Sequence, residues 1–466
     1  MNDFDLKRID KEKSVFFIGI GGISMSALAH ILKNDGYKVS GSDFKQSDTI
    51  SELILSGIPV TVGHKAENVE NAGLVVYTAA IKKDNPELVR ARELNIPAIE
   101  RAVLLGAMMK NYKYPVAVSG THGKTTATSM ISHILCESDK DPTILVGGVL
   151  PLIGGNMRDG GKDYFVTEAC EYCASFLKFF PLYSIILNIE EDHLDYFKDI
   201  DDIIDCFSKF VKKTPASGAV IANFDDEEVI KAVSDAPCKV VSYSLNNKDC
   251  DYYVQNLKFD ENGFSEFDVF YKNEFYICVK LSVPGLHNVS NSLAVIAAAD
   301  LLGVGKEGIK KGLLSYKGTN RRFEYKGEVN GAKIYDDYAH HPTEIKATLS
   351  AAKATGAHRI RCVFQPHTYT RSYALKDEFA NAFYNCDDLV VTDIFAAREP
   401  DTGLIHSKDL VEAINKTGKN AKYIKDFSDI EEYLKKTAQK GDIIFTMGAG
   451  DVYKIGESLI KNGGEK

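Results

Sequence analysis

Short apolar runs, each followed by a turn and then by apolar positions at helical spacing, recur along most of this 466-residue chain. Such runs are typical of strands buried on both faces of a parallel sheet. They predict strands at 15–20, 37–43, 72–78, 96–99, 115–119, 163–167, 182–189, 333–335, 361–365, 389–394 and 443–447. They predict helices at 27–32, 127–136, 201–213 and 284–302. This alternation predicts the α/β class.

The length of the chain predicts about three domains. We place them at residues 1–109, 110–316 and 317–466. Residues 239–280 alternate polar and apolar positions, which predicts an antiparallel excursion from the second sheet. Residues 312–327 are basic and rich in turn formers, so we interpret them as the hinge into the third domain.

A glycine-rich segment separates a predicted strand from a predicted helix. Its residues are Gly120, Thr121, His122, Gly123, Lys124, Thr125 and Thr126. Such a loop presents backbone N–H groups to phosphate oxygens at a helix N-terminus. Lys124 would then reach the terminal phosphates and Thr125 would hold Mg²⁺. Val118 replaces the first glycine of the longer phosphate-loop pattern. The alternative is a plain strand–helix turn with a surface lysine. We expect Lys124 to face solvent, so that its loss leaves the fold intact.

A second glycine turn follows the first predicted strand and contains Gly19, Gly21 and Gly22. The next predicted strand ends at Asp43, as in a dinucleotide-binding βαβ unit. Ser24 replaces the third glycine of that fingerprint, so the signal is weak alone. The two interpretations are a nucleotide site with Asp43 on a ribose, or a tight turn with no ligand.

Polar residues follow two predicted strands of the second domain. Glu168 and His193 both lie where ligands of open α/β sheets bind, beyond strand carboxyl ends. A carboxylate and an imidazole there would complete the shell of a metal that bridges phosphates. Alternatively, His193 is a core or capping residue, and residues 190–192 are a solvated helix start.

Asn288 and Asn291 share one face of a predicted alanine-rich helix. They would contact an adenine edge or, alternatively, cap the helix.

A formal net charge of −9 argues against a broad nucleic-acid interface. Nine scattered cysteines predict reduced thiols, and Cys170-x-x-Cys173 is interpreted as two incidental thiols. Residues 1–14 carry no signal-peptide pattern, and no apolar run is long enough for a membrane span. We therefore expect a cytoplasmic protein without a membrane partner.

Seven motifs occur in a fixed order along the chain. They are Gly19-Ile20-Gly21-Gly22, the loop at 120–126, Glu168-Ala169-Cys170-Glu171, Asp192-His193, His287-Asn288-x-x-Asn291, Arg321-Arg322-Phe323 and Asp336-Asp337-Tyr338-x-His340-His341-Pro342. This set resembles the Mur ligase family over essentially the whole chain.

The resemblance implies a Rossmann-like N-terminal domain, a central P-loop ATPase domain and a Rossmann-like C-terminal domain that closes over the amino acid and ATP. The ATP-binding residues that it implies are Gly120, Thr121, His122, Gly123, Lys124, Thr125, Thr126, His287, Asn288, Asn291 and Asp337. It implies UDP-sugar contacts at Gly19, Gly21, Gly22, Ser42, Asp43 and Thr78, and Mg²⁺ at Thr125, Glu168 and His193. The implied catalytic residues are Lys124, His193, Arg322, His341 and Arg371.

The activity implied by the resemblance is ATP-dependent ligation of L-alanine to UDP-N-acetylmuramate through an acyl phosphate, in peptidoglycan precursor synthesis. A recycling branch of the family attaches a preformed tripeptide to the same UDP-sugar. The N-terminal run at residues 19–27 and the segment at 336–342 look more like the alanine-adding branch. The rival hypotheses are a dehydrogenase that uses the first glycine turn and a nucleotide-dependent switch. We expect a monomer or weak homodimer.

Overall fold

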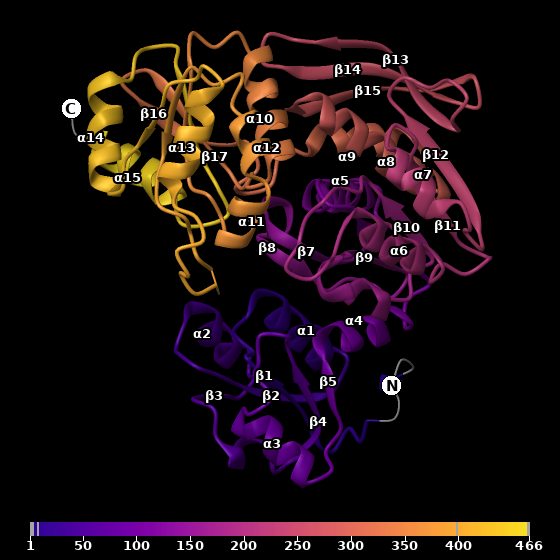
Figure 1. The fold of residues 1–466 in the computed structure, drawn as a ribbon. Coiled ribbons are helices and arrows are strands. Elements are labelled where there is room, and N and C mark those ends of the chain that lie inside the picture. Colours follow the sequence, from indigo (N-terminus) through magenta and orange to yellow (C-terminus); the bar gives the residue numbers. More distant parts are fainter. Residues whose placement is uncertain (1–3, 7–8, 398, 464–466) are drawn as a thin grey trace.

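Three separate β-sheets, each covered by helices, follow one another along the chain (Figure 1). The computed structural model describes residues 4–6, 9–397 and 399–463. The predicted α/β class is confirmed. In the described residues, no helix combines the length and the apolar character needed to cross a membrane.

The first sheet is parallel throughout. Its elements are β1 (Ser14–Ile18), α1 (Ile23–Asn34), β2 (Lys38–Asp43), α2 (Asp48–Leu55), β3 (Val60–Val62), η2 (Ala66–Val69), β4 (Ala72–Tyr77), α3 (Pro86–Glu93), β5 (Ala98–Glu100) and α4 (Arg101–Met109). The strand order is β3-β2-β1-β4-β5, so strands are added on one side of β1 up to β3 and on its other side from β4 onward. The glycine turn after β1 lies at this switch point, where open α/β sheets bind ligands.

The second sheet has ten strands. Its elements are β6 (Tyr114–Ser119), α5 (Lys124–Cys136), β7 (Thr143–Leu150), η3 (Pro151–Ile153), β8 (Gly155–Arg158), β9 (Tyr164–Glu168), η4 (Tyr172–Lys178), β10 (Tyr183–Ile186), α6 (Ile200–Val211), β11 (Ala219–Asn223), α7 (Glu227–Val233), β12 (Lys239–Ser244), β13 (Tyr252–Phe259), β14 (Phe264–Tyr271), β15 (Glu274–Pro284), α8 (Leu286–Leu301) and α9 (Lys306–Ser315). The order is β15-β14-β13-β12-β11-β10-β6-β9-β7-β8. Thus β6, which leads into the phosphate loop, lies between β10 and β9.

The predicted antiparallel excursion begins later than residue 239. Strand β12 pairs in parallel with β11, and β13 joins β12 in parallel over two residue pairs. Only β14 and β15 add antiparallel strands. The reason is that the chain reaches β12 through helix α7, and a helical crossover returns a strand in the parallel direction.

The third sheet is parallel except for one edge strand. Its elements are β16 (Glu324–Val329), β17 (Ala332–Asp337), α10 (Pro342–Ala354), β18 (Ile360–Phe364), α11 (Tyr369–Ala374), α12 (Lys376–Ala380), β19 (Asp388–Val391), α13 (Ser407–Lys416), β20 (Ala421–Tyr423), α14 (Phe427–Thr437), β21 (Ile443–Met447) and α15 (Tyr453–Gly463). The order is β16-β17-β21-β18-β19-β20, with β16 antiparallel to β17.

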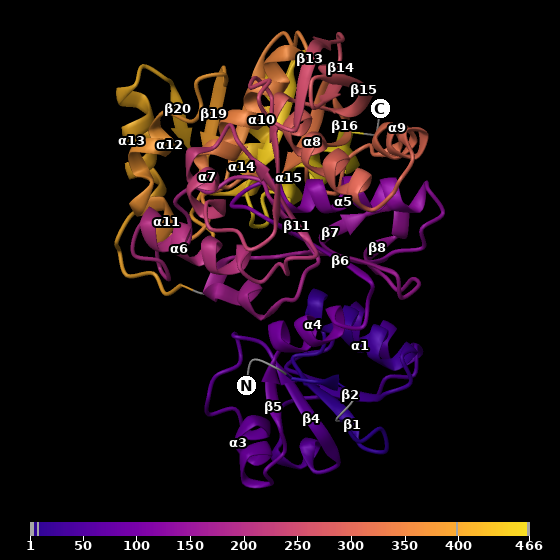
Figure 2. The ribbon, with the colours of Figure 1, turned by 90° about the vertical axis from the view of Figure 1, so that its right-hand side faces the viewer.

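The N-terminal and C-terminal domains are placed differently relative to the central domain. The C-terminal domain packs beside the central one, whereas the N-terminal domain extends below them in both views (Figures 1 and 2). Helix α4 joins the first two domains closely: a Cβ on Gly106 would lie only 1.9 Å from the carbonyl oxygen of Lys178. The predicted boundaries at 109/110 and 316/317 fall between sheets, and their exact positions stay predictions.

Candidate functional site

A cavity of about 720 Å³ lies between the central and C-terminal domains. The phosphate loop, the start of α8, the hinge segment and the start of α10 contribute to its wall. Of the residues singled out from the sequence, those that line it are His122, Gly123, Thr126, His287, Asn288, Asn291, Arg322 and Asp337. Seven of these eight are predicted ATP-binding residues, so the structure brings most of that set together.

The phosphate loop requires glycine at one close approach. Gly123 has a φ of +81°, and a Cβ there would lie 2.8 Å from Oδ1 of Asn291. Asn188 braces the other side of the loop: its Oδ1 accepts from His122 N at 2.7 Å and its Nδ2 donates to His122 O at 3.1 Å. The loop conformation is therefore fixed by two side chains from neighbouring segments.

Lys124 does not face solvent. Its side chain is 16% exposed, and Nζ lies 3.0 Å from Oε2 of Glu171. The ammonium also donates to the carbonyl oxygens of Gly120 and Thr121 at 2.5 and 3.0 Å. Burial lowers the pKa of Lys124, but the opposing effects of nearby groups, led by the charge of Glu171, together raise the net pKa. The expectation of a solvent-facing lysine is wrong, because the loop folds its side chain back over its own carbonyls.

The residues predicted to hold Mg²⁺ lie around the same loop. Thr125 is buried in the first turn of α5. Glu168 ends β9, and its Oε1 accepts from Gly147 N at 2.5 Å. A Cβ on Gly148 would lie 3.3 Å from the Thr125 methyl, so neighbouring glycines of β7 approach both side chains. These two oxygen donors fit Mg²⁺, which prefers carboxylate and hydroxyl ligands.

His193 lies in a strained turn at a φ of +55°. Its Nε2 is 3.6 Å from Oε1 of Glu171, and its ring packs against Tyr172 at 4.6 Å. With 24% of the side chain exposed, it is not a core histidine. The interpretation of residues 190–192 as a helix start is wrong, because α6 begins only at Ile200 and Asp192 is buried.

Asn288 and Asn291 are buried inside α8, whose N-cap is Gly285. Asn288 Nδ2 donates to Pro284 O at 2.7 Å, and Asn291 Nδ2 donates to Asn288 Oδ1 at 3.3 Å. Neither side chain therefore caps a backbone N–H of the helix, and the capping alternative is wrong.

Asp337 is a buried carboxyl at the end of β17. It accepts from the backbone N–H groups of Phe323 and Ala339 at 2.9 and 2.8 Å. Burial raises its pKa to about 6, against the opposing charge of Arg322. His287, which lines the same cavity, has its pKa lowered to about 4 by burial and is neutral near pH 7.

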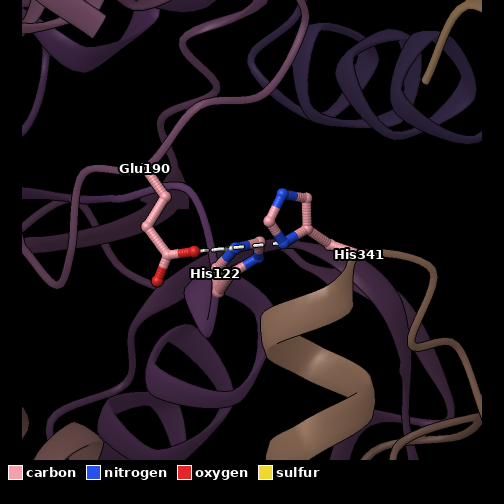
Figure 3. A group of neighbouring side chains, drawn as sticks. All are labelled: His122, Glu190 and His341. Atoms are coloured by element: carbon pink, nitrogen blue, oxygen red, sulfur yellow. Dashed lines mark ion pairs between the residues drawn. The ribbon is translucent and has the colours of Figure 1, made fainter. Parts of the chain in front are cut away.

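His122, Glu190 and His341 converge where the phosphate loop meets the start of α10 (Figure 3). Glu344 on α10 contacts His122 Nδ1 at 3.3 Å and Arg322 at 3.8 Å. Burial lowers the pKa of His122, but Glu190 and Glu344 raise it to about 9. This cluster joins the central and C-terminal domains.

Arg371, predicted as catalytic, lies outside the large cavity. Its Nε and Nη2 both donate to Oδ1 of Asp192, at 3.0 and 2.9 Å. It therefore forms a second connection between the same two domains, beside His193.

The predicted UDP-sugar residues stay in the N-terminal domain, away from the wall of the cavity described above. Asp43 Oδ2 accepts from Gly21 N at 2.9 Å, and Gly22 N donates to Gly19 O at 3.2 Å. Ser42 is fully buried, and its hydroxyl donates to Glu87 at 2.8 Å. Thr78 Oγ1 accepts from Ala80 N at 3.3 Å in the turn after β4. The turn itself is thus prefolded, whereas ligand contacts there stay predictions.

Three family models match successive parts of the chain: a Mur ligase family catalytic domain at residues 14–113, a Mur ligase middle domain at 118–299 and a Mur ligase glutamate ligase domain at 321–450. The UDP-N-acetylmuramate–L-alanine ligase of Acetivibrio thermocellus is 55% identical over 453 residues, which are 97% of each chain. The chain belongs to the Mur ligase family. The corresponding ligase of Clostridium acetobutylicum is 53% identical over 98% of this Mur ligase and 99% of its own length.

Solved structures agree with this assignment. The UDP-N-acetylmuramate–alanine ligase of Thermotoga maritima superposes with a TM-score of 0.80 at 30% identity, over 97% of this Mur ligase and 99% of that chain. A murein peptide ligase from Psychrobacter arcticus gives a TM-score of 0.70 at 25% identity over the same shares of the two chains. The predicted three-domain Mur ligase architecture is therefore confirmed.

Sequence reasoning missed four residues of this Mur ligase site: Asn188, Glu171, Glu190 and Glu344. Glu171 stands in a quoted motif, yet its pairing with Lys124 needs the three-dimensional fold. Glu344 had a usable signal, since His341-Pro342-Thr343-Glu344 matches the spacing of a capping box, and the structure shows that box. Asn188 lies beyond the end of β10, in a stretch predicted as strand.

Proposed function

We propose that this Mur ligase joins L-alanine to the lactyl carboxylate of UDP-N-acetylmuramate and hydrolyses ATP to ADP and phosphate. The observation that carries this proposal is the 55% identity to an enzyme of that name over 97% of both chains. The residues predicted to bind the nucleotide support it, because most of them line one cavity between the central and C-terminal domains.

ATP binds in the interdomain cavity under this proposal. Asn288 and Asn291 contact the base, and the Asp337 carboxylate accepts from the ribose. The phosphates lie on the N–H groups of the loop at 120–126, where the helix dipole of α5 favours negative charge. When ATP binds, the Lys124 ammonium leaves Glu171 and contacts phosphate oxygens. In the nucleotide-free enzyme the ion pair with Glu171 therefore holds Lys124 beside the phosphate site.

Mg²⁺ would be held by Thr125 and Glu168, with His193 as a further ligand nearby. When bound, the ion supplies charge neutralisation for the transferring phosphoryl group. An imidazole is less usual for this hard cation, so Glu168 and Thr125 are the stronger assignments.

The chemistry proceeds in two transfers. A lactyl carboxylate oxygen accepts the γ-phosphoryl group, which breaks the bond to ADP and makes an acyl phosphate. The amine of alanine then attacks the carbonyl carbon; the amide bond forms, phosphate leaves with that carboxylate oxygen, and the amine loses its proton. Lys124 and Arg322 stabilise the developing negative charge by position and electrostatics.

His341 is the proposed proton acceptor for the alanine amine. Its Nε2 contacts the carbonyl oxygen of Glu191 at 3.1 Å, which fixes the proton on that nitrogen. Burial lowers the pKa of His341, so the ring is neutral near pH 7 and its other nitrogen carries a lone pair. Arg371, held by Asp192 outside the cavity, would act where the two domains close on the substrates.

The N-terminal turn at residues 19–22 would bind the UDP-sugar, with Asp43 on its ribose. All nine cysteines are free thiols, which supports a cytoplasmic location. We retain the monomer or weak homodimer, without nucleic-acid or membrane partners, as part of this proposal.

The test is ADP release by the full-length enzyme with Mg²⁺, measured with UDP-N-acetylmuramate and L-alanine together and with each omitted. The proposal predicts fast release only when both are present. Release that ignores the UDP-sugar would indicate a nucleotide-dependent switch, and NAD reduction without ADP release would indicate a dehydrogenase.

A further inference from the structure

The cluster of His122, Glu190 and His341 has the composition and spacing of a transition-metal site. His122 Nε2 lies 3.5 Å from Glu190 Oε2, and His341 Nδ1 lies 3.9 Å from the same oxygen. All three ligand atoms lie within 4.8 Å of one another (Figure 3). Ligands of a tetrahedral zinc ion are about 3.3 Å apart, given bonds of about 2.0–2.1 Å. Small side-chain movements therefore suffice to close the cluster around an ion.

Each imidazole has its outer nitrogen on an acceptor. His122 Nδ1 faces the Glu344 carboxylate at 3.3 Å, and His341 Nε2 faces the Glu191 carbonyl at 3.1 Å. Both outer nitrogens therefore carry hydrogen, so a metal would bind the inner nitrogens. On His122 the metal would displace the second ring proton, which Glu190 and Glu344 stabilise in its absence. Histidines that ligate metals have this same outer partner, which fixes their tautomer.

The inner nitrogens of His122 and His341 lack short hydrogen bonds. His122 Nε2 is fully buried, and its ion pair with Glu190 Oε2 at 3.5 Å does not form a hydrogen bond. His341 Nδ1 accepts only a long bond, 3.3 Å, from the backbone N–H of Thr343. Glu190 Oε2 accepts from the Thr343 hydroxyl at 2.5 Å, which orients the carboxylate toward the two rings.

We propose that His122, Glu190 and His341 bind one divalent ion of the Zn²⁺ or Co²⁺ class in the nucleotide-free enzyme. Two imidazoles and one carboxylate suit these ions, whereas Mg²⁺ prefers an all-oxygen shell. The fourth position opens toward the cavity, since His122 and Glu190 both line it. The site is distinct from Thr125 and Glu168 in its residues and in its preferred metal.

Such an ion links two domains. His122 belongs to the phosphate loop, Glu190 to the segment after β10, and His341 is the N-cap of α10 in the C-terminal domain. The bound ion therefore holds the two domains together and occupies the phosphate end of the cavity. Competition with ATP rests on the proposed function, whereas metal binding itself does not.

The test titrates Co²⁺ into full-length nucleotide-free enzyme in excess Mg²⁺ and follows visible absorption, with equilibrium dialysis for stoichiometry. We expect one Co²⁺ per chain with the intense bands of a tetrahedral site and no sulfur-to-cobalt charge-transfer band. Zn²⁺ should displace it. Weak octahedral absorption alone, or no binding, would overturn the proposal.

Variants localise the site. His122→Asn and His341→Asn should each abolish the tetrahedral spectrum, and Thr343→Val should weaken Co²⁺ binding by about 10–100-fold, as for other partners that orient ligands. The matched control is His358→Ala, since His358 is 63% exposed and lies in the bend before β18. Cys173→Ser with Cys278→Ser removes the two exposed thiols and should change nothing.

Circular dichroism establishes that each variant is folded. If a histidine variant does not fold, the wild-type spectrum and Thr343→Val still decide the question. A tetrahedral spectrum that survives in folded histidine variants, or that disappears with the thiols, would assign the metal elsewhere. Because no substrate is present, this outcome is separable from any failure of the ligase activity.

Discussion

Arg371 of the C-terminal domain and Asp192 of the central domain form an ion pair across the domain boundary. Both Nε and Nη2 of the arginine reach one carboxylate oxygen, and the side chains are 9% and 10% exposed. Burial alone would raise the pKa of Asp192, but the charges of Arg371 and His193 hold it well below its usual range. The pair is therefore charged at neutral pH, and it weakens only as the pH falls below the usual range of an aspartate.

Breaking this pair should loosen the two domains. Removing one partner of a buried ion pair costs about 3–5 kcal/mol, because the other charge stays buried. We expect Arg371→Ala and Asp192→Asn to increase the radius of gyration of the nucleotide-free enzyme in small-angle X-ray scattering and to reduce ligation. Lys436→Ala is the control, since its pair with Glu432 is exposed and contributes little to stability. Unchanged scattering in both variants would refute the role of this pair in closure.

Variants of the ion pair between Lys124 and Glu171 distinguish the effect of Lys124 on catalysis from its effect on stability. Lys124→Ala should abolish ligation and also lower the melting temperature, because Glu171 is left buried without its cation. Adding Glu171→Gln should recover stability but not activity. Lys239→Ala, at an exposed position, should match the wild type within about 0.5 kcal/mol. Calorimetry and ADP release decide this; ligation by the double variant would end the phosphate-loop assignment.

We expect the affinity for the nucleotide to depend on pH through the Asp337 carboxyl. Burial raises its pKa to about 6, with Arg322 opposing and Glu344 adding to the rise. A raised carboxyl pKa favours folding below the unfolded value, near 4, and that contribution is lost as the pH rises through about 6. The charged form accepts hydrogen bonds from a ribose, so binding should weaken as the pH falls below about 6.

The comparison is between the wild type and Asp337→Asn with a non-hydrolysable ATP analogue, by calorimetry from pH 5 to 8. The variant removes one titration and leaves that of the phosphates, so the difference between the two profiles isolates Asp337. Parallel profiles would contradict the ribose contact.

Replacing Gly21 should selectively weaken binding of the UDP-sugar. A Cβ there would lie 2.9 Å from Asp43 Oδ2 and 3.2 Å from Ile50. Gly21→Ala should displace Asp43, raise the KM for UDP-N-acetylmuramate and leave the KM for ATP near the wild-type value. Gly305→Ala is the matched control, since a Cβ there meets nothing within 4 Å. Equal changes in both KM values would argue against a UDP site at this turn.

The spacing of apolar residues along the chain predicted most of the strands and helices. Strands such as β6 and β21 and the start of α10 at Pro342 follow from local signals, because apolar runs and the proline position act within a few residues. The predicted strand at 182–189 is too long, since β10 ends at Ile186. Beyond it, the backbone carbonyl of Asn188 accepts from Thr121 N of the phosphate loop at 3.0 Å instead of continuing the ladder. Nothing local distinguishes those two uses of the backbone.

The site was predictable where a motif fixes a backbone shape, as at Gly123, and not where it depends on domain contacts. Lys124 was expected in solvent because its partner Glu171 lies 47 residues along the chain. Asp192 and Arg371 are 179 residues apart, and only the packing of two domains brings them together.

One competition assay tests most directly whether L-alanine is the preferred acceptor. The wild-type enzyme receives UDP-N-acetylmuramate and ATP with equal concentrations of L-alanine, glycine, L-serine and a preformed tripeptide, and products are identified by mass. Differences of one methyl or hydroxyl group are worth only about 1–3 kcal/mol, so glycine and serine should give minor products. The expected result is that the alanine adduct dominates and that no tripeptide adduct forms. A dominant tripeptide adduct would contradict it and move this Mur ligase to the recycling branch.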